Sequence, residues 1–378
     1  MSLKRVAGML IILAAGIYLA VYITFLSIPA ADVFSDVIPE VQVYKGNEAE
    51  ENIYAFICRN LVSEDGGILT NIKNCTGCRD TLAESVGLMM NYCLLSDNRT
   101  QYHDQFNFLK NKLIEDNMFI KWRTGENTAS CNAAIDDLRI IRALMDGYDM
   151  WHDEDYYNLA GNLQYNMYKY QVSDRSLYEF FDWTNGRSGS TVPLCYFDLY
   201  TMDRLSEFNA GWLAVEESSL SIISDGRIGS SPFFYKYFDH DTATYGFDEE
   251  YAKQKGICLT YTLYTVIHLI EVNEDTDFFT LWLKDEMKDG RLYSWYNPGS
   301  LKPVNNIEST AVYALAAIYA DKAGEKQLYK KLIEGMKKFM VTDKKSPYYG
   351  GFGMPADKSF HSFDNLTALW AVTMSGGN

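Results

Sequence analysis

The sequence predicts an all-α protein built from two concentric layers of helices. Apolar residues recur at helical spacing along most of the chain beyond Glu40, and few segments read as strands. Some of the expected helices are apolar nearly all round, such as Ser309–Ala320, whereas Lys326–Lys338 has a clear charged face. An inner ring of helices covered by an outer ring would produce this alternation of buried with amphipathic helices.

The expected helices follow one another without a dividing linker or a repeat of fixed length, so we predict one domain over residues 40–378. In a double ring, the loops before the inner helices gather at one end. A ligand groove there would be floored by helix starts. The helical spacing covers Ala49–Leu61, Thr81–Leu95, Gln101–Asn117, Ala133–Tyr148, Glu154–Tyr170, Thr201–Phe208, Gly211–Ile223, Ala252–Val272, Phe278–Lys288, Ser309–Ala320, Lys326–Phe339 and Asp364–Met374.

The N-terminus carries a targeting signal. After Lys4 and Arg5, the segment Val6–Ile28 has no charged residue over 23 positions, which at about 1.5 Å per residue can span a hydrocarbon core. Because the positive charges precede this segment, the rest of the chain is expected outside the cytoplasm. We predict that residues 1–31 form a single-pass membrane anchor. A cleaved signal peptide, which would make the protein secreted, is the alternative.

Composition narrows the class of ligand. The chain has 50 Asp and Glu residues against 34 Lys and Arg, which argues against nucleic acid as a partner. Tyr (28) and Trp (7) are abundant, and such amphipathic rings are common in polar ligand grooves. A zinc site is not expected, because Cys75 and Cys78 have no second CxxC or His pair at ligand spacing. These two cysteines form either a disulfide or two free thiols.

Two expected helices begin with carboxylates. Glu84 lies in TLAESVGLMM, and Asp136 and Asp137 lie in NAAIDDLRIIRAL. A helix start favours negative charge and burial disfavours it, so such residues can acquire the different pKa values that acid and base catalysis need. Structural roles are the alternative. Thr81 and Glu84 have the spacing of a capping box, and the two aspartates could simply favour the helix dipole.

The order of these segments resembles the family-8 glycoside hydrolases. AESVGLMM, then FIKWR at Phe119–Arg123, then NAAIDDLRIIRAL, then PLCYFDLYTMDRLSEF at Pro193–Phe208 are similar to that family's glutamate, tryptophan, aspartate and tyrosine segments. The resemblance covers roughly Glu51–Phe208 and is weak beyond. It implies an (α/α)6 barrel, an inverting endo-β-glycanase, and no need for a metal or another cofactor.

The resemblance also assigns residues. Glu84 matches the general acid, and Asp137 matches the second acidic residue of the family's Asp-x-Asp pair, with Asp136 at the spacer position. Adjacent helical residues point about 100° apart, so we expect only one of the two aspartates to face the groove squarely. The residues expected to bind sugar are Trp122, Asn132, Tyr196, Phe197 and Asp364.

The general base has no clear counterpart in the sequence. The family's Tyr-Asp-Ala-x-Arg segment is missing, and we take Asp248, in Tyr245-Gly-Phe-Asp, as the candidate in the corresponding part of the chain. The acidic cluster Asp239-His-Asp241 and Asp364 are further candidates. In an inverting enzyme the two carboxyl groups stand roughly 6.5–9.5 Å apart to admit a water molecule.

Three functions remain open at this stage. The first is a membrane-anchored glycosidase that cuts a β-linked polysaccharide, such as an exopolysaccharide or a cellulose-like glycan, alongside the machinery that makes it. The second is a catalytically impaired barrel that binds such a polymer, because the base segment is missing. The third is a surface assembly protein that uses its helices as a scaffold.

Overall fold

The structure, a computed structural model, describes residues 47–374. Thirteen α-helices lie in this part of the chain, so the all-α prediction is confirmed. The predicted membrane anchor at residues 1–31 lies outside the described residues. Between residues 47 and 374, no helix combines the length and the apolar character needed to cross a membrane.

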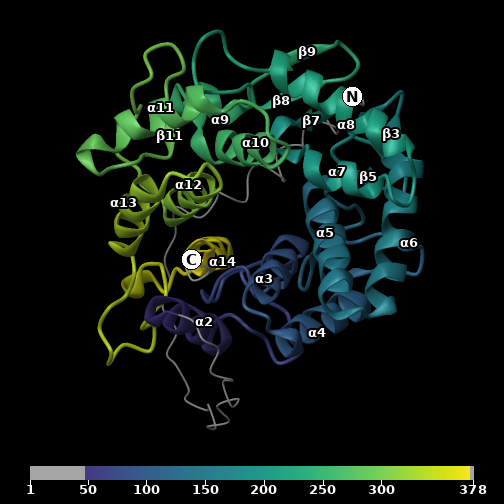
Figure 1. Ribbon diagram of the computed structural model, residues 1–378. Helices are drawn as coiled ribbons and strands as arrows, with labels where there is room; N and C mark the ends of the chain where they lie inside the picture. Colours follow the sequence, from purple (N-terminus) through teal and green to yellow (C-terminus); the bar gives the residue numbers. More distant parts are fainter. Residues whose placement is uncertain (1–46, 375–378) are drawn as a thin grey trace, which may run out of the picture. The chain divides into compact units, whose positions relative to one another are not determined.

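Six helices of the described chain form a closed inner ring (Figure 1). Each packs against the next in the order α3, α5, α7, α10, α12 and α14, and α14 packs against α3 again. Consequently α10 stands opposite α3 across the ring. The inner helices are α3 (Ala83–Leu95), α5 (Ala134–Trp151), α7 (Leu199–Leu205), α10 (Leu259–Glu271), α12 (Thr310–Lys322) and α14 (Ser362–Met374).

An outer layer of helices covers this ring. Four of them, α4, α6, α8 and α13, each pack against the inner helix that precedes them in the chain, and α2 packs against α14. The helix α11 contacts α12 through a hydrogen bond between the hydroxyls of Thr280 and Tyr319. The outer helices are α2 (Glu48–Asn60), α4 (Arg99–Phe108, continued by a π-helical turn at Leu109–Leu113), α6 (Glu154–Gln171), α8 (Gly211–Asp225), α11 (Asp277–Glu286) and α13 (Lys326–Lys337). This arrangement is the predicted double ring, an (α/α)6 barrel.

The pair α12 and α13 shows why the sequence separates into two layers. Every residue of α12 from Thr310 to Ala320 is buried, because inner helices surround one face and an outer helix covers the other. In α13 only Leu328, Tyr329, Leu332 and Gly335 with Met336 are buried, at the spacing of a single helix face. The uniformly apolar sequence therefore predicts the inner position, and the amphipathic sequence predicts the outer one.

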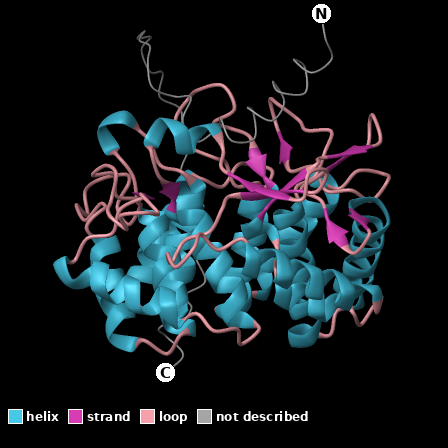
Figure 2. Ribbon diagram, turned by 90° about the horizontal axis from the view of Figure 1, so that it is seen from above, coloured by secondary structure: helices cyan, strands magenta, loops and turns pink. Residues whose placement is uncertain are grey.

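Short strands gather at one end of the barrel, where the inner helices begin (Figure 2). All pairings are antiparallel. The strands are β1 (Thr81–Leu82) with β2 (Arg123–Thr124), β3 (Val172–Ser173) with β4 (Ser176–Leu177), β5 (Phe181–Asp182) with β6 (Arg187–Ser188), β7 (Thr191–Pro193) with β8 (Tyr237–Asp239) and β9 (Thr244–Gly246), and β10 (Ile257–Cys258) with β11 (Trp295–Tyr296). In the same region, Cys75 and Cys78 form a disulfide.

One predicted helix is divided in the structure. The segment expected to be a single helix over Ala252–Val272 includes the end of the short α9 (Glu249–Gln254), a break, and then α10. At the break Lys255 has a left-handed backbone (φ 58°), which ends a helix, and Ile257 then enters β10. The periodicity runs through the break, although Gly256, directly after Lys255, is a residue that commonly follows the end of a helix.

Candidate active site

Glu84 lies in the first turn of α3, half-buried at the strand end of the barrel. The capping-box alternative does not hold here. Thr81 is in β1, where it pairs with Thr124, and the N-cap of α3 is Leu82, which has no side-chain cap bond. The adjacent Trp122 carbonyl accepts a hydrogen bond from the Ala83 N–H (2.9 Å) and fixes the start of the helix. The Glu84 carboxyl is thus not used in capping its own helix.

The next inner helix supplies a carboxylate and a cation. Arg139 Nη1 donates to Asp136 Oδ1 at 2.6 Å, and both side chains are buried. Gly87 on α3 makes room for this pair, because a Cβ at Gly87 would lie 3.0 Å from Arg139 Cδ. Arg139 therefore packs tightly against α3, and its charge acts on both Asp136 and Glu84.

The helix on the other side of α3 supplies a second carboxylate. Asp364, in the first turn of α14, is half-buried, and its Oδ1 accepts from the Ala311 N–H (3.0 Å) and the Ser309 hydroxyl (3.4 Å) at the start of α12. The two helix starts are joined by a buried hydrogen bond between the hydroxyls of Ser85 and Ser362 (3.0 Å). Three carboxylates, from α3, α5 and α14, thus meet at one end of the barrel.

This arrangement gives Glu84 the electrostatics of an acid catalyst. Burial, and then the carboxylates of Asp136 and Asp364, raise the pKa of Glu84 to about 7, against the opposing effect of Arg139. Burial also raises the pKa values of Asp136 and Asp364, and Arg139 opposes the shift at Asp136. A glutamic acid with a pKa near neutrality can hold a proton and still release it at physiological pH.

Asp137 and Asn132 lie away from this cluster. Asn132 Nδ2 donates to Asp137 Oδ2 and to Gln171 Oε1 (both 2.6 Å), and its Oδ1 accepts from the Phe181 N–H (2.7 Å). Both Nδ2 hydrogens and the Oδ1 of Asn132 have partners within the protein, and the residue is 1% exposed. Of the two neighbouring aspartates, Asp136 is therefore the one that acts on Glu84, and Asn132 has no free group for a sugar.

Of the three aromatic residues predicted to bind sugar, two lie near the cluster and one is buried in the core. Trp122 and Tyr196 are partly exposed near the cluster. Trp122 precedes β2, beside the start of α3, and the Asp136 carboxylate contributes to the raised pKa of Tyr196 after burial and Glu179. Phe197 is completely buried in the core. Its ring packs between helices and offers no face to a sugar.

Asp248 has a structural environment. Its Oδ1 caps α9 by accepting from the Tyr251 N–H (2.9 Å), and its Oδ2 pairs with Lys236 Nζ (2.6 Å). It borders a small pocket with Lys236 and Tyr261 above the start of α10. Asp248 is not among the charges that act on Glu84.

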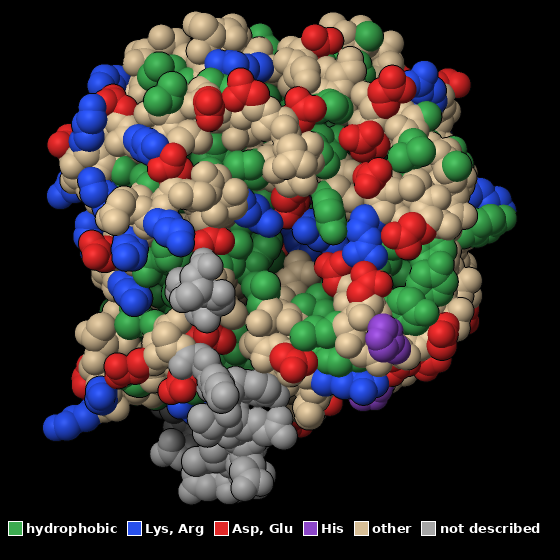
Figure 3. All heavy atoms as spheres, viewed as in Figure 1, with side chains coloured by type: hydrophobic (Ala, Val, Ile, Leu, Met, Phe, Trp, Pro, Cys, Tyr) green, Lys and Arg blue, Asp and Glu red, His purple; other side chains and the backbone are tan. Residues whose placement is uncertain are grey.

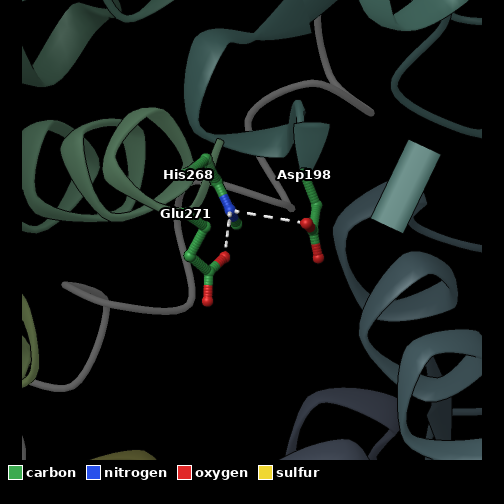
Figure 4. A group of neighbouring side chains, drawn as sticks. All are labelled: Asp198, His268 and Glu271. Atoms are coloured by element: carbon green, nitrogen blue, oxygen red, sulfur yellow. Dashed lines mark ion pairs between the residues drawn. The ribbon is translucent and has the colours of Figure 1, made fainter. Parts of the chain in front are cut away.

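A second group of ionisable side chains lies near the C-terminal ends of α10 and α12, about 18 Å of helix from the start of α10. His268 Nδ1 lies 3.7 Å from Asp198 Oδ1 and 3.8 Å from Glu271 Oε2 (Figure 4). Arg142 binds both Glu271 oxygens (2.9 and 3.0 Å), and Lys322 binds one of them (2.8 Å). Arg142 Nη1 also lies 3.8 Å from Asp198 Oδ1, so two cations face the two carboxylates and the group is an ion-pair network. Figure 3 shows acidic and basic side chains around a hollow in the middle of the ring.

Comparison with known proteins agrees with this fold. A protein described as a novel alpha-amylase from Clostridium perfringens is 32% identical, with a TM-score of 0.81 over 86% of this chain and 97% of that one. Endoglucanase Cel10 from Klebsiella pneumoniae, described as a family 8 glycosyl hydrolase, is 13% identical, with a TM-score of 0.62 over 88% and 100%. The chain belongs to the family of the clostridial protein, and its fold is that of the family-8 glycoside hydrolases.

The resemblance read from the sequence is thereby confirmed for the fold. The Bacillus subtilis protein described as "Putative lipoprotein YdaJ" is also similar, with 28% identity over 322 residues and 84% of each chain covered. No family model matches the chain.

Within this family-8 fold, the helix opposite Glu84 begins without a carboxylate. The first residues of α10 are Leu259, Thr260 and Tyr261, so this helix offers no acidic side chain across the ring from α3. Two charged residues near the site were not singled out from the sequence. The sequence could have indicated Arg139, because it stands three residues after Asp136, on the same face of the helix. Nothing in the sequence indicates Glu179. Burial raises the pKa of Glu179 to about 7, although Lys236 and Thr191 act to lower it.

Proposed function

We propose that the protein is an extracytoplasmic glycoside hydrolase that cleaves a β-linked polysaccharide with inversion, using Glu84 as the general acid. The observation that carries this proposal is the meeting of Glu84, Asp136 and Asp364 at the starts of three adjacent inner helices. Cleavage of a glycosidic bond needs one carboxylic acid that protonates the leaving oxygen and one carboxylate that activates water. The raised pKa of Glu84 suits the first task.

Asp364 is the carboxylate that best suits the second task. Glu84 and Asp364 stand in the first turns of neighbouring helices, and the Asp364 carboxylate contributes to the raised pKa of Glu84. An inverting enzyme would need the two carboxyl groups roughly 6.5–9.5 Å apart. Only one oxygen of Asp364 is used in hydrogen bonds to α12, so the other can accept a proton from water. Asp136, held by Arg139, would bind hydroxyls of the sugar that lies at the cleavage point.

The linkage of the substrate has two candidates. Solved structures with the same fold are described as endo-β-1,4-glucanases, and this supports a β-linked glycan such as an exopolysaccharide. The second candidate is an α-glucan, because the relative that is 32% identical is described as an alpha-amylase.

The location is also a proposal. The uncharged segment Val6–Ile28 and the similarity to a protein described as a lipoprotein both support a position at the outer face of the membrane. There the enzyme would meet the polysaccharide as the synthesis machinery of the cell exports it.

Release of reducing ends from a panel of polysaccharides tests this function. The panel contains carboxymethylcellulose, mixed-linkage β-glucan, chitosan, an acetylated exopolysaccharide and soluble starch. Cleavage of a β-linked member, with the anomer of the new reducing end inverted in the NMR spectrum, is expected. Cleavage of starch alone would mean that the substrate is an α-glucan and not a β-linked glycan. Release of a retained anomer would contradict the inverting mechanism.

The pH dependence of kcat/KM should report the proton on Glu84. The acid must be protonated, and its pKa is about 7, so activity should fall about tenfold per pH unit above that value. On the acidic side, activity should fall as the base becomes protonated, above the ordinary aspartate pKa of about 3.9 because burial raises the pKa of Asp364. A rate that stays constant up to pH 9 would contradict the assignment of Glu84.

Replacement of Asp364 by Asn should separate the two candidate bases. The amide oxygen can still accept from Ala311 N–H, so the start of α12 should remain intact, but Asn cannot take a proton from water. We expect the reducing-end assay to show a loss of about 100-fold or more. Asp248→Asn is the matched variant and should retain most of its activity. The reverse pattern would move the base to Asp248.

A further inference from the structure

The hydroxyl of Tyr264 has no hydrogen-bond partner within residues 47–374, although the side chain is only 7% exposed. Other buried tyrosines in this barrel are satisfied. Tyr102 donates to the Ala143 carbonyl (2.8 Å), and Tyr319 donates to the Thr276 carbonyl (3.0 Å). A buried phenol without a partner reduces stability, since it has lost its hydrogen bonds to water. Such a group is therefore a candidate for contact with a ligand.

Tyr264 lies next to Arg139, the cation of the carboxylate cluster. It belongs to the second turn of α10, the helix opposite α3, and Arg139 stands over its ring with the guanidinium carbon 5.7 Å from the ring centroid. The charges that act on it are those of Arg139, Glu84 and Asp136. The tyrosine ring thus reaches from the far side of the barrel to the pair that flanks the general acid.

The phenol is held in its neutral, donating form. Burial raises its pKa well above the usual value, and the carboxylates of Glu84 and Asp136 add to this effect against Arg139. Its ring is fixed by packing, with centroids 6.5 Å from Phe363 on α14 and 6.3 Å from His268 on its own helix. The hydroxyl is therefore a donor in a fixed position.

We propose that Tyr264 donates a hydrogen bond to a free hydroxyl of the sugar bound beside Glu84, and that this hydroxyl donates in turn to Asp136. This inference rests on the proposed function. A sugar hydroxyl is both an acceptor and a donor, which is what a neighbouring phenol and carboxylate require together. An ether or a deoxy position cannot meet both, so the substrate is a glycan whose ring is unsubstituted at this position.

The Tyr264→Phe variant tests the contact, because it removes the hydroxyl alone. Binding of cellohexaose and maltohexaose is measured by calorimetry in the inactive Glu84→Gln chain, with and without Tyr264→Phe. We expect affinity for the bound hexasaccharide to fall about tenfold to a hundredfold. The melting temperature should be unchanged or higher, since no internal hydrogen bond is lost. In the active chain, kcat/KM should fall by a similar factor.

Tyr319→Phe is the matched control. Its hydroxyl also contacts Thr280 (2.6 Å), between α12 and α11, so this variant should melt at a lower temperature and bind sugar normally. If Tyr264→Phe behaves like Tyr319→Phe, its role is structural and the inference is overturned. Unchanged binding by Tyr264→Phe overturns the inference and leaves the function intact. If the Glu84→Gln chain binds neither hexasaccharide and the active chain cleaves no member of the polysaccharide panel, both are overturned.

Discussion

The Glu84→Gln variant is expected to lose glycoside hydrolysis by about 100-fold to 10,000-fold, the range that a positioned general acid contributes. Glutamine keeps the size and shape of the side chain but cannot protonate the leaving oxygen. The loss should appear in kcat and in kcat/KM alike, because proton transfer occurs only in the transition state. Reducing-end release from the polysaccharide that the wild-type chain cleaves measures both.

The Glu84→Gln variant should also be at least as stable as the wild-type protein above pH 7. The pKa of Glu84 is raised in the folded protein, so the stabilising effect of its protonated form is lost as the pH rises through about 7. Glu84→Gln avoids this loss, and its melting temperature should equal or exceed that of the wild-type protein at pH 8. Glu217→Gln, on an exposed side chain, is the control and should alter neither quantity. Wild-type turnover by Glu84→Gln would remove Glu84 from the mechanism.

The order of motifs, more than helix periodicity, makes Glu84 predictable from the sequence. The spacing alone favours a capping box, and the structure excludes that role because Thr81 is in a strand. The double ring is predictable for another reason. The positions of uniformly buried helices such as α12 require apolar residues on every face, and this pattern is visible in the sequence.

The choice between Asp136 and Asp137 is not visible in the sequence. Both residues are buried, at 7% and 5% exposure, so burial alone does not distinguish the side that faces the groove from the side that faces α6. The partners decide it, because Arg139 holds Asp136, and Asn132 holds Asp137. Asp364 was weighed for both base and sugar-binding roles for a similar reason. Its proximity to Glu84 depends on ring closure between α14 and α3, which are far apart in the chain.

Removal of the Glu271 carboxylate should cause the largest loss of stability outside the proposed active site. Burial alone would raise the pKa of Glu271, but His268, Arg142 and Lys322 together hold it well below the usual value. Glu271→Gln would leave Arg142 and Lys322, both partly buried, without a common counter-charge. Breaking a buried ion pair in this way costs about 3 kcal/mol. Because α5, α10 and α12 are joined here, the loss affects the whole inner ring.

This loss should be measurable as a fall in melting temperature on the order of 5 °C at pH 7. The difference from the wild-type protein should narrow in acid. A lowered pKa contributes stability above the unfolded value of about 4.3, and that stability is lost as the pH falls towards the folded value. Asp285→Asn removes the same charge from an ion pair with Lys288 whose side chains are 71% and 73% exposed, and should leave the melting temperature unchanged. Equal melting temperatures for Glu271→Gln and Asp285→Asn would mean that the network does not hold the inner helices together.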